Sequence, residues 1–498
     1  MAPKTSRHTE VERKFEVTTY TVAPSFDGLS AVARVERSPL QQLDATYFDT
    51  SDRDLAAHRI TLRRRTGGTD AGWHLKLPAG PDSRTEVHAP LDDADAGVPE
   101  ALRDVVLAIV RAKPLSPVAT ISTRRSVDVL YGADGAALAE FCDDDVTAAA
   151  VGGDAAEQRW REWELELLAA PEAAPADLLD RLSNRLLDAG AGPAGHGSKL
   201  ARVLDTAGTA AETAPIPADP VHRAIAEQVG QLLVWDRAVR ADAFDSVHQM
   251  RVTTRKIRSL LQESKDSFPL ADNEWILDEL RTLAAVLGVA RDAEVLAERY
   301  ERSLDGLPAD LVRGPVRERL VDGAKRRYAA GLRRSVAAMR TERYFHLLDA
   351  LEALVAAEPP TAAPGEEPRQ LNLDAAYKRV RKSAKAAYAA ERADDPHKDE
   401  ALHRIRKGAK RLRYTAAATG EERVSARAKT IQTLLGDHQD STVSRAHLSA
   451  QAQAAHAAGE DTFTYGLLYR LEDEVSQQAR AQLDDALKQL KKAVQKAH

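Results

Sequence analysis

The chain is poor in the residues that mark secreted and membrane-bound proteins. Its 498 residues include a single cysteine, Cys142, which excludes an internal disulfide and predicts a reducing compartment. No run approaches the ~18 apolar residues of a membrane span, and the N-terminus lacks the apolar segment of a signal peptide. We therefore expect a soluble, cytoplasmic protein with no membrane partner.

A strong overall charge is also missing. The formal net charge is −6, so the molecule as a whole is not a general nucleic-acid binder. Hydrophobic residues make up 43% of the chain, enough to bury real cores, and the length fits two or three domains. Charge is concentrated locally instead, first in short alternating runs and later in helical ones.

Two segments of linker composition, 204–220 and 358–369, divide the chain. Short alternating runs precede the first linker, and long runs rich in Ala, Leu and Arg follow it. The expected order is a β-rich domain at 5–203, then two helical halves at 221–357 and 370–495.

The first alternating run, 9–17, places charge on one side of a strand. Glu10, Glu12 and Lys14 share a face because successive side chains of a strand point to opposite sides. Buried charges need partners, so this face suits a cavity that holds a metal and a polyanion. For any single strand, a solvated sheet face is the alternative interpretation.

The same alternation recurs in the later runs of this domain. Basic residues fill the middle runs, and a second acidic pair, Glu164 and Glu166, lies near the end. A closed barrel would bring that pair next to Glu10 and Glu12 around one lumen. Carboxylates on one wall could hold Mg²⁺ or Mn²⁺, while the basic side chains could bind several phosphates.

Together these residues resemble the CYTH domain, the family of triphosphate tunnel metalloenzymes, over roughly 5–203. Glu10-x-Glu12-x-Lys14 is similar to its ExExK signature, and further features follow in the family's order. These features are Arg63, Arg65, Lys76, Arg84 with Glu86, Arg124, Asp144, Glu164 with Glu166, and Ser198-Lys199. The resemblance implies an eight-stranded antiparallel β-tunnel with flanking helices, which hydrolyses the terminal phosphoanhydride of a triphosphate.

The resemblance and the chemistry together imply a role for each residue. The metal ligands would be Glu10, Glu12, Glu164 and Glu166, with Glu162 able to substitute for one of them. The phosphate ligands would be Lys14, Arg63, Arg65, Lys76, Arg84, Arg124 and Lys199. Lys14 would also be catalytic, and Glu86 or Asp144 would orient or deprotonate the attacking water. Asp144 is preferred to its neighbours Asp143 and Asp145 because it shares the parity of Glu140.

An internal repeat organises the helical part of the chain. His248 returns 155 positions later as His403, and Arg251 returns as Arg406. Helix positions i, i+3, i+7 and i+10 lie within about 80°, so each copy carries a basic stripe led by histidine. The stripes are His248, Arg251, Arg255 and Arg258, and then His403, Arg406, Lys410 and Arg413, with Lys407 beside the second. Such stripes imply a polyanionic partner or acidic residues packed opposite.

This repeated, histidine-led helix resembles the CHAD domain, the conserved-histidine α-helical domain, over about 221–495. The resemblance implies a pair of four-helix bundles with a basic surface that binds inorganic polyphosphate and associates with polyphosphate granules. Nucleic acid is disfavoured as a partner, because the overall charge is acidic and Tyr414 beside Arg413 is the one aromatic residue among the stripes.

The leading hypothesis is an enzyme with an anchor. A metal-dependent triphosphatase, acting most readily on inorganic triphosphate, would be tethered to a polyphosphate-binding helical domain, which raises the local concentration of substrate. Two alternatives stay open: a non-catalytic, granule-associated polyphosphate-binding protein, and a nucleotide cyclase, which uses the same metal and phosphate groups.

Overall fold

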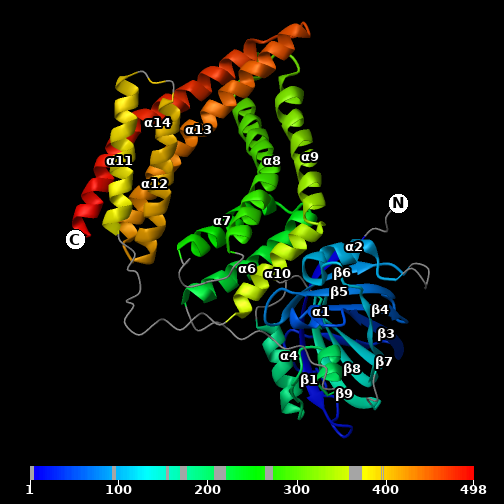
Figure 1. Cartoon of the computed structure of the whole chain (residues 1–498). Coiled ribbons are helices and arrows are strands. Elements are labelled where there is room, and N and C mark those ends of the chain that lie inside the picture. The colour runs from blue at the N-terminus through cyan, green and yellow to red at the C-terminus, as the bar shows by residue number, and fades with distance from the viewer. Residues whose placement is uncertain are drawn as a thin grey trace, which may run out of the picture. The chain divides into compact units, whose positions relative to one another are not determined.

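The computed structural model describes residues 5–91, 97–152, 156–168, 177–206, 220–263, 273–357, 373–393, 395 and 397–497. The predicted linker at 358–369 lies outside these residues, as does most of the linker at 204–220. The chain divides into two compact units, one formed by Met1–Leu283 with Val336–Pro359 and the other by Ala284–Ser335 with Pro360–His498. Figure 1 shows a strand-rich N-terminal part and a C-terminal part built of helices.

An antiparallel barrel forms the N-terminal part. Around the ring its strands follow the order β1, β6, β5, β4, β3, β7, β8 and β9, and β9 pairs with β1 to close it. Their bounds are β1 Ser6–Val17, β3 Gln41–Asp49, β4 Thr61–Thr66, β5 Gly72–Pro78, β6 Ser83–Ala89, β7 Ser116–Tyr131, β8 Ala137–Ala150 and β9 Gln158–Leu167. Short strands β2 (Arg34–Arg37) and β10 (Gly192–Pro193) pair with β7 and β1. The predicted eight-stranded antiparallel tunnel is confirmed.

The apolar faces of the strands point outward and are covered by helices. Trp163 and Leu165 of β9 pack in one core with α4, and Trp73 and Leu75 of β5 pack in another with α2 and α3. The helices of this part are α1 Asp54–Ala57, α2 Glu100–Val105, α3 Leu107–Val110, α4 Leu178–Asp188 and α5 Lys199–Thr206. This arrangement leaves the charged parity of β5 and of β9 facing inward, because alternate side chains point to opposite faces.

Helix α5 closes one end of the barrel. Its residues Leu200 and Val203 share a core with Tyr47 of β3 and Ile121 of β7. Ile121 has the same parity as Arg125, which lines the central cavity, so this core lies on the inner side of the sheet. Because α5 covers this segment, the inward strand face can carry apolar side chains here. The same helix brings Lys199, its first residue, into the cavity.

The C-terminal part is all-helical, as predicted. Its elements are α6 Pro220–Arg240, α7 Ser246–Glu263, α8 Asn273–Asp305, η1 Ala309–Leu311, the π-helical turn η2 Glu318–Asp322, α9 Gly323–Ala338, α10 Glu342–Ala356, α11 Leu373–Arg392, α12 Lys398–Ala418, α13 Glu422–Ala457 and α14 Phe463–Lys496. Helices α11 to α14 share one hydrophobic core. The border between the two compact units falls within α8. Every helix in the described ranges is too short or too polar to cross a membrane.

Candidate functional site

The inner face of the barrel surrounds a cavity of about 630 Å³. On β1 the cavity is lined by Glu10, Glu12 and Lys14, as the alternation along this strand predicts. The other predicted site residues on its wall are Arg63, Arg65, Lys76, Arg84, Glu86, Glu164, Glu166 and Lys199. Because the barrel closes through β1 and β9, the two acidic pairs meet, with Glu12 directly opposite Glu166 in the strand register.

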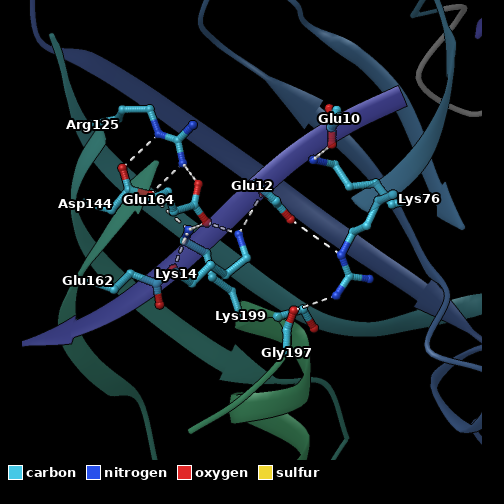
Figure 2. A network of polar contacts seen from close by, with 12 residues as sticks. Glu10, Glu12, Lys14, Lys76, Arg125, Asp144, Glu162, Glu164, Gly197 and Lys199 are labelled. Carbon is cyan, nitrogen blue, oxygen red and sulfur yellow. Dashed lines mark hydrogen bonds and ion pairs between the residues drawn. The ribbon is translucent and has the colours of Figure 1, made fainter. Parts of the chain in front are cut away.

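Glu164 is the centre of a buried ion-pair network (Figure 2). Lys14, Arg125 and Lys199 all contact its carboxylate, the last at 2.7 Å. Burial opposes ionisation of Glu164, but these cations outweigh it and hold its pKa well below the usual range. Lys199 reaches Glu162 at 2.7 Å as well, so this ammonium group links two acids of β9.

Asp144 lies behind the same cations. Its side chain is fully buried, and it accepts hydrogen bonds from Arg125 Nε at 2.8 Å and Nη2 at 2.6 Å. Lys199 Nζ lies 2.9 Å from its second oxygen. Asp144 therefore contacts the cavity through Arg125 and Lys199, which it positions, rather than by facing the cavity directly.

A second network surrounds Glu86. His74 Nδ1 lies 2.6 Å from Glu86 Oε1, and Lys76 Nζ lies 3.3 Å from Oε2 while it also pairs with Glu10. Burial lowers the pKa of His74 to about 4, although its contact with Glu86 acts in the opposite direction. The other ring nitrogen of His74, Nε2, lies 3.0 Å from the backbone oxygen of Asp70, and Glu86 is held as an anion by His74 and Lys76.

Around Glu10 and Glu166 the cavity carries more negative charge than the nearby cations neutralise. Burial and the nearby Glu10 raise the pKa of Glu166 to about 7, and Glu12 and Glu164 act in the same direction. Burial also raises the pKa of Glu10, with Glu86 contributing, against the effect of Lys76. Carboxylates that resist ionisation for this reason would each be stabilised by an added cation.

The opposite imbalance occurs around Arg65, although its guanidinium group pairs with Asp70. Burial lowers the pKa of Arg65 to about 9, with Arg63 and Arg125 adding repulsion. The Nε atoms of Arg63 and Arg65 are buried and find no hydrogen-bond acceptor in the part of the chain that the structure describes. Crowded guanidinium groups with unused donors would be stabilised by a polyanion, since phosphate oxygens accept bidentate hydrogen bonds.

The donor set fits a hard divalent cation. Two groups of side chains bring one ligand atom each within 4.8 Å of one another: His8, Glu10 and Glu86, and Asp144, Glu162 and Glu164. Five of these six donors are carboxylates, the ligands that Mg²⁺ and Mn²⁺ prefer. Glu12 and Glu166 line the cavity but belong to neither group, so the predicted metal quartet remains a prediction.

Arg124 is the one predicted phosphate ligand that the structure places elsewhere. It is exposed on the outer face of β7, whereas Arg125 lines the cavity beside Val127. The expectation followed the rule that the apolar parity faces outward. On β7 the inward parity includes Ile121, which α5 covers, and Val127, which lies on the cavity wall.

Sequence reasoning also missed several cavity residues of the inward parity. Glu140 of β8 was used only to choose Asp144, and Tyr47 of β3 received no role, yet both line the cavity. Tyr47 accepts a hydrogen bond from Arg63 Nη1 at 3.3 Å. The alternation along β3 and β8 was the signal that could have identified them.

The first basic stripe lies along α7. His248, Arg251, Arg255 and Arg258 are all half-buried there, and Met250 and Ile257 on the adjoining face are in the core. Burial lowers the pKa of Arg258, and Arg281 of α8 and Arg255 add repulsion. The stripe is thus next to a further cation within the same compact unit.

The second stripe lies along α12 and faces α13. His403, Arg406, Lys410 and Arg413 are half-buried, and Lys407 is exposed. A Cβ built on Gly436 would lie 3.4 Å from Nη2 of Arg406, so this glycine leaves space for the guanidinium group. Burial lowers the pKa of His403, and Lys407 and Arg406 act in the same direction.

Comparison with known proteins agrees with both parts of the chain. The CYTH domain model matches residues 8–191, and the CHAD domain model matches residues 223–449. Two Mycobacterium tuberculosis proteins, Uncharacterized protein MT2285 (strain CDC 1551 / Oshkosh) and Uncharacterized protein Rv2226 (strain ATCC 25618 / H37Rv), are each 65% identical over 508 aligned residues. Each alignment covers 100% of this chain and 99% of the relative. The chain therefore belongs to the proteins that join a CYTH domain to a CHAD domain.

Solved structures similar to the chain include PptA from Streptomyces chartreusis and the CHAD domain from the plant Ricinus communis. The first has a TM-score of 0.44 and 18% identity, covering 55% of this chain and 100% of that one. The second has a TM-score of 0.41 and 23% identity, covering 54% of this chain and 90% of that one.

Proposed function

We propose that the tunnel domain hydrolyses the terminal phosphoanhydride of inorganic triphosphate with the help of Mg²⁺ or Mn²⁺. One observation carries the proposal: a single cavity holds Arg63 and Arg65, whose buried Nε atoms find no hydrogen-bond acceptor among the described residues, and Glu166, whose ionisation is opposed by burial and by Glu10. A complex of a triphosphate with a divalent metal supplies both charges at once.

Each group of side chains in the cavity would have its own role in the reaction. Lys14, Arg63, Arg65 and Arg125 would bind the phosphates, and Glu86, held as an anion by His74, would orient the attacking water. The metal ligands would come from Glu10, Glu12, Glu164 and Glu166, and a bound metal would withdraw charge from the phosphoryl oxygens. Positioning and charge neutralisation are the main catalytic effects in phosphoryl transfer.

The lining of the cavity favours inorganic triphosphate over a nucleotide. Among the described residues that line it, the aliphatic side chains are Leu43 and Val127, and Tyr47 is the one aromatic carbocycle. Tyr47 already contacts Arg63. A nucleoside would need an apolar or aromatic surface for its base, which this largely charged wall does not offer.

The test is phosphate release by the full chain from inorganic triphosphate, ATP, thiamine triphosphate and long polyphosphate, each with Mg²⁺ and with Mn²⁺. We expect Glu12→Gln to lower the rate about a hundredfold or more and to weaken Mn²⁺ binding in calorimetry. Glu36→Gln, on an exposed residue of β2, is the matched control. A wild-type protein that binds these compounds without releasing phosphate supports the non-catalytic alternative, and cyclic nucleotide formation supports the cyclase.

We also propose that the helical domain binds inorganic polyphosphate through the stripes on α7 and α12. The observation behind this proposal is that burial lowers the pKa of Arg258 and of His403, and that neighbouring cations add repulsion at each: Arg281 and Arg255 at the first, Lys407 and Arg406 at the second. A linear polyanion would relieve this repulsion, and arginine is well suited to phosphate. Binding of labelled linear polyphosphate by the full chain tests it, and a lack of saturable binding at low salt would contradict it.

A further inference from the structure

The second compact unit contains a groove that the proposed function does not use. It lies between α11 and α14, has a volume of about 1030 Å³, and has Val380, Ala384 and Leu487 among its lining residues. Seven exposed cations also line it: Arg392 at the C-terminal end of α11, and a row of six, which are Lys378, Arg381, Lys382 and Lys385 of α11 with Lys488 and Lys491 of α14. The groove therefore combines an apolar base with strongly basic edges.

These six cations have no acidic partner. None of them forms an ion pair within the residues that the structure describes. The two acids that line the groove are already engaged: Glu391 pairs with Arg480, and Asp484 accepts a hydrogen bond from Tyr388. Unpaired like charges along one groove are stabilised by a polyanion, so the groove is suited to a ligand of that class.

Two tyrosines distinguish this groove from a simple basic surface. Successive residues of a helix are rotated by about 100° around its axis. Viewed along the axis of α11, the four cations of the row on this helix therefore fall within an arc of about 100°, and Tyr377 and Tyr388 lie together at one edge of that arc. Both tyrosines line the groove, and Tyr388 is 37% exposed. Their separation of three helical turns is about 16 Å. The groove thus offers two aromatic rings in line with a row of cations.

The internal repeat does not account for this feature. At the 155-residue offset, Lys378 corresponds to Arg223 of α6, but Arg381, Lys382 and Lys385 correspond to Ala226, Glu227 and Gly230. Furthermore, α14 lies beyond residue 449, where the match to the CHAD domain ends. The groove is therefore separate from the duplicated stripes.

We propose that the groove between α11 and α14 binds single-stranded nucleic acid, with phosphates on the lysines and bases on Tyr377 and Tyr388. Cations alone would suit any polyanion, but inorganic polyphosphate has no group for the aromatic rings or the apolar base. Nucleic-acid bases do, since stacking on aromatic side chains and a basic track for the backbone are the usual means of binding single strands.

The experiment uses the full chain and a fluorescent oligouridylate of about eight nucleotides, followed by anisotropy across a series of salt concentrations. Six phosphate contacts predict a slope of about −4 for log K against log[salt]. Lys378→Gln with Lys382→Gln should make that slope shallower by about 1.4. The matched control, Arg423→Gln with Arg427→Gln, removes the same charge at the same spacing from exposed positions of α13 and should leave the slope unchanged.

Tyrosine variants separate nucleic acid from other polyanions. Tyr377→Leu and Tyr388→Leu should each weaken oligouridylate binding at least about fivefold, whereas Tyr388→Phe, which keeps the ring, should retain it. Binding of linear polyphosphate should be unchanged in all three. The proposal is overturned if the wild type shows no saturable binding of oligouridylate, if the lysine pair and its control behave alike, or if both leucine variants bind normally.

Discussion

Cations in the tunnel lie among carboxylates, whereas cations on α11 lie among other cations. In the tunnel, Lys14 and Lys199 are buried between carboxylates of β1, β8 and β9. On α11 the cations lie beside other cations, without an ion pair in the described chain. A ligand of the tunnel must therefore exchange existing ion pairs, while a ligand of the helices adds the missing charge. The first arrangement favours selectivity and the second favours general affinity for polyanions.

The largest effect should come from removing a tunnel cation. Lys199→Met leaves Asp144, Glu162 and Glu164 buried without their shared partner, so we expect a loss of about 3–5 kcal/mol in the free energy of unfolding. Urea unfolding of the full chain measures it. The same change at the exposed Lys407 of α12 should cost within about 0.5 kcal/mol.

A second measurement distinguishes lost packing from lost charge in that variant. Added Mg²⁺ should stabilise Lys199→Met more than the wild type, because three carboxylate oxygens within 4.8 Å of one another would then have lost the ammonium group that they share. Equal stabilisation of both proteins, or similar losses at Lys199 and Lys407, would contradict the contrast between the two regions.

The helical part should be more sensitive to volume than to single charges. A Cβ at Gly331 of α9 would lie 2.8 Å from the backbone nitrogen of Ala290 in α8, and neither backbone moves easily. We expect Gly331→Ala to lose about 1–2 kcal/mol in the free energy of unfolding, because overpacking exceeds the gain in helix propensity.

Gly230→Ala in α6 is the control for that substitution. Nothing lies within 4 Å of the added Cβ, so the same change should stabilise the protein by about 0.5–1 kcal/mol. A stabilising effect at both positions would show that α8 and α9 separate without cost.

Single charges of the stripes should have smaller effects. Arg255→Gln or Arg406→Gln should weaken polyphosphate binding by about two- to fivefold, since partly exposed ion pairs contribute up to about 1 kcal/mol. Triphosphate hydrolysis should be unaffected. Arg427→Gln on the exposed face of α13 is the control, and equal losses in all three would assign the binding to net charge rather than to the stripes.

The alternation of side chains along single strands predicted most of the tunnel. It gave the wrong inward face where an element distant in the sequence covers the strand. Glu10, Glu12 and Lys14 could be placed on the inner face because β1 alternates cleanly. Arg124 was expected to line the tunnel but lies on the outer face of β7, because α5, some 80 residues later, covers an apolar inner segment of that strand. The repeat predicted both stripes, but not the groove, which joins α11 to a helix about 100 residues further on.

The smallest effects are expected from two histidines whose pKa values are both lowered by burial but whose partners differ. His74 in the tunnel contacts Glu86, whereas His447 of α13 lies 2.9 Å from the hydroxyl of Tyr300. Burial lowers the pKa of each to about 4, with Arg327 adding to the effect at His447. Between about pH 4 and 6.5 the unfolded chain binds more protons than the folded one, so stability falls as the pH is lowered through this range.

Replacing each histidine should separate their contributions. His447→Gln should reduce the proton uptake on unfolding between pH 4 and 6.5 by up to one proton, as measured by unfolding at a series of pH values. His74→Gln should do the same but also lower triphosphate hydrolysis, because Glu86 loses the donor that holds it. If His74→Gln changed proton uptake without changing hydrolysis, Glu86 would have no part in positioning the attacking water.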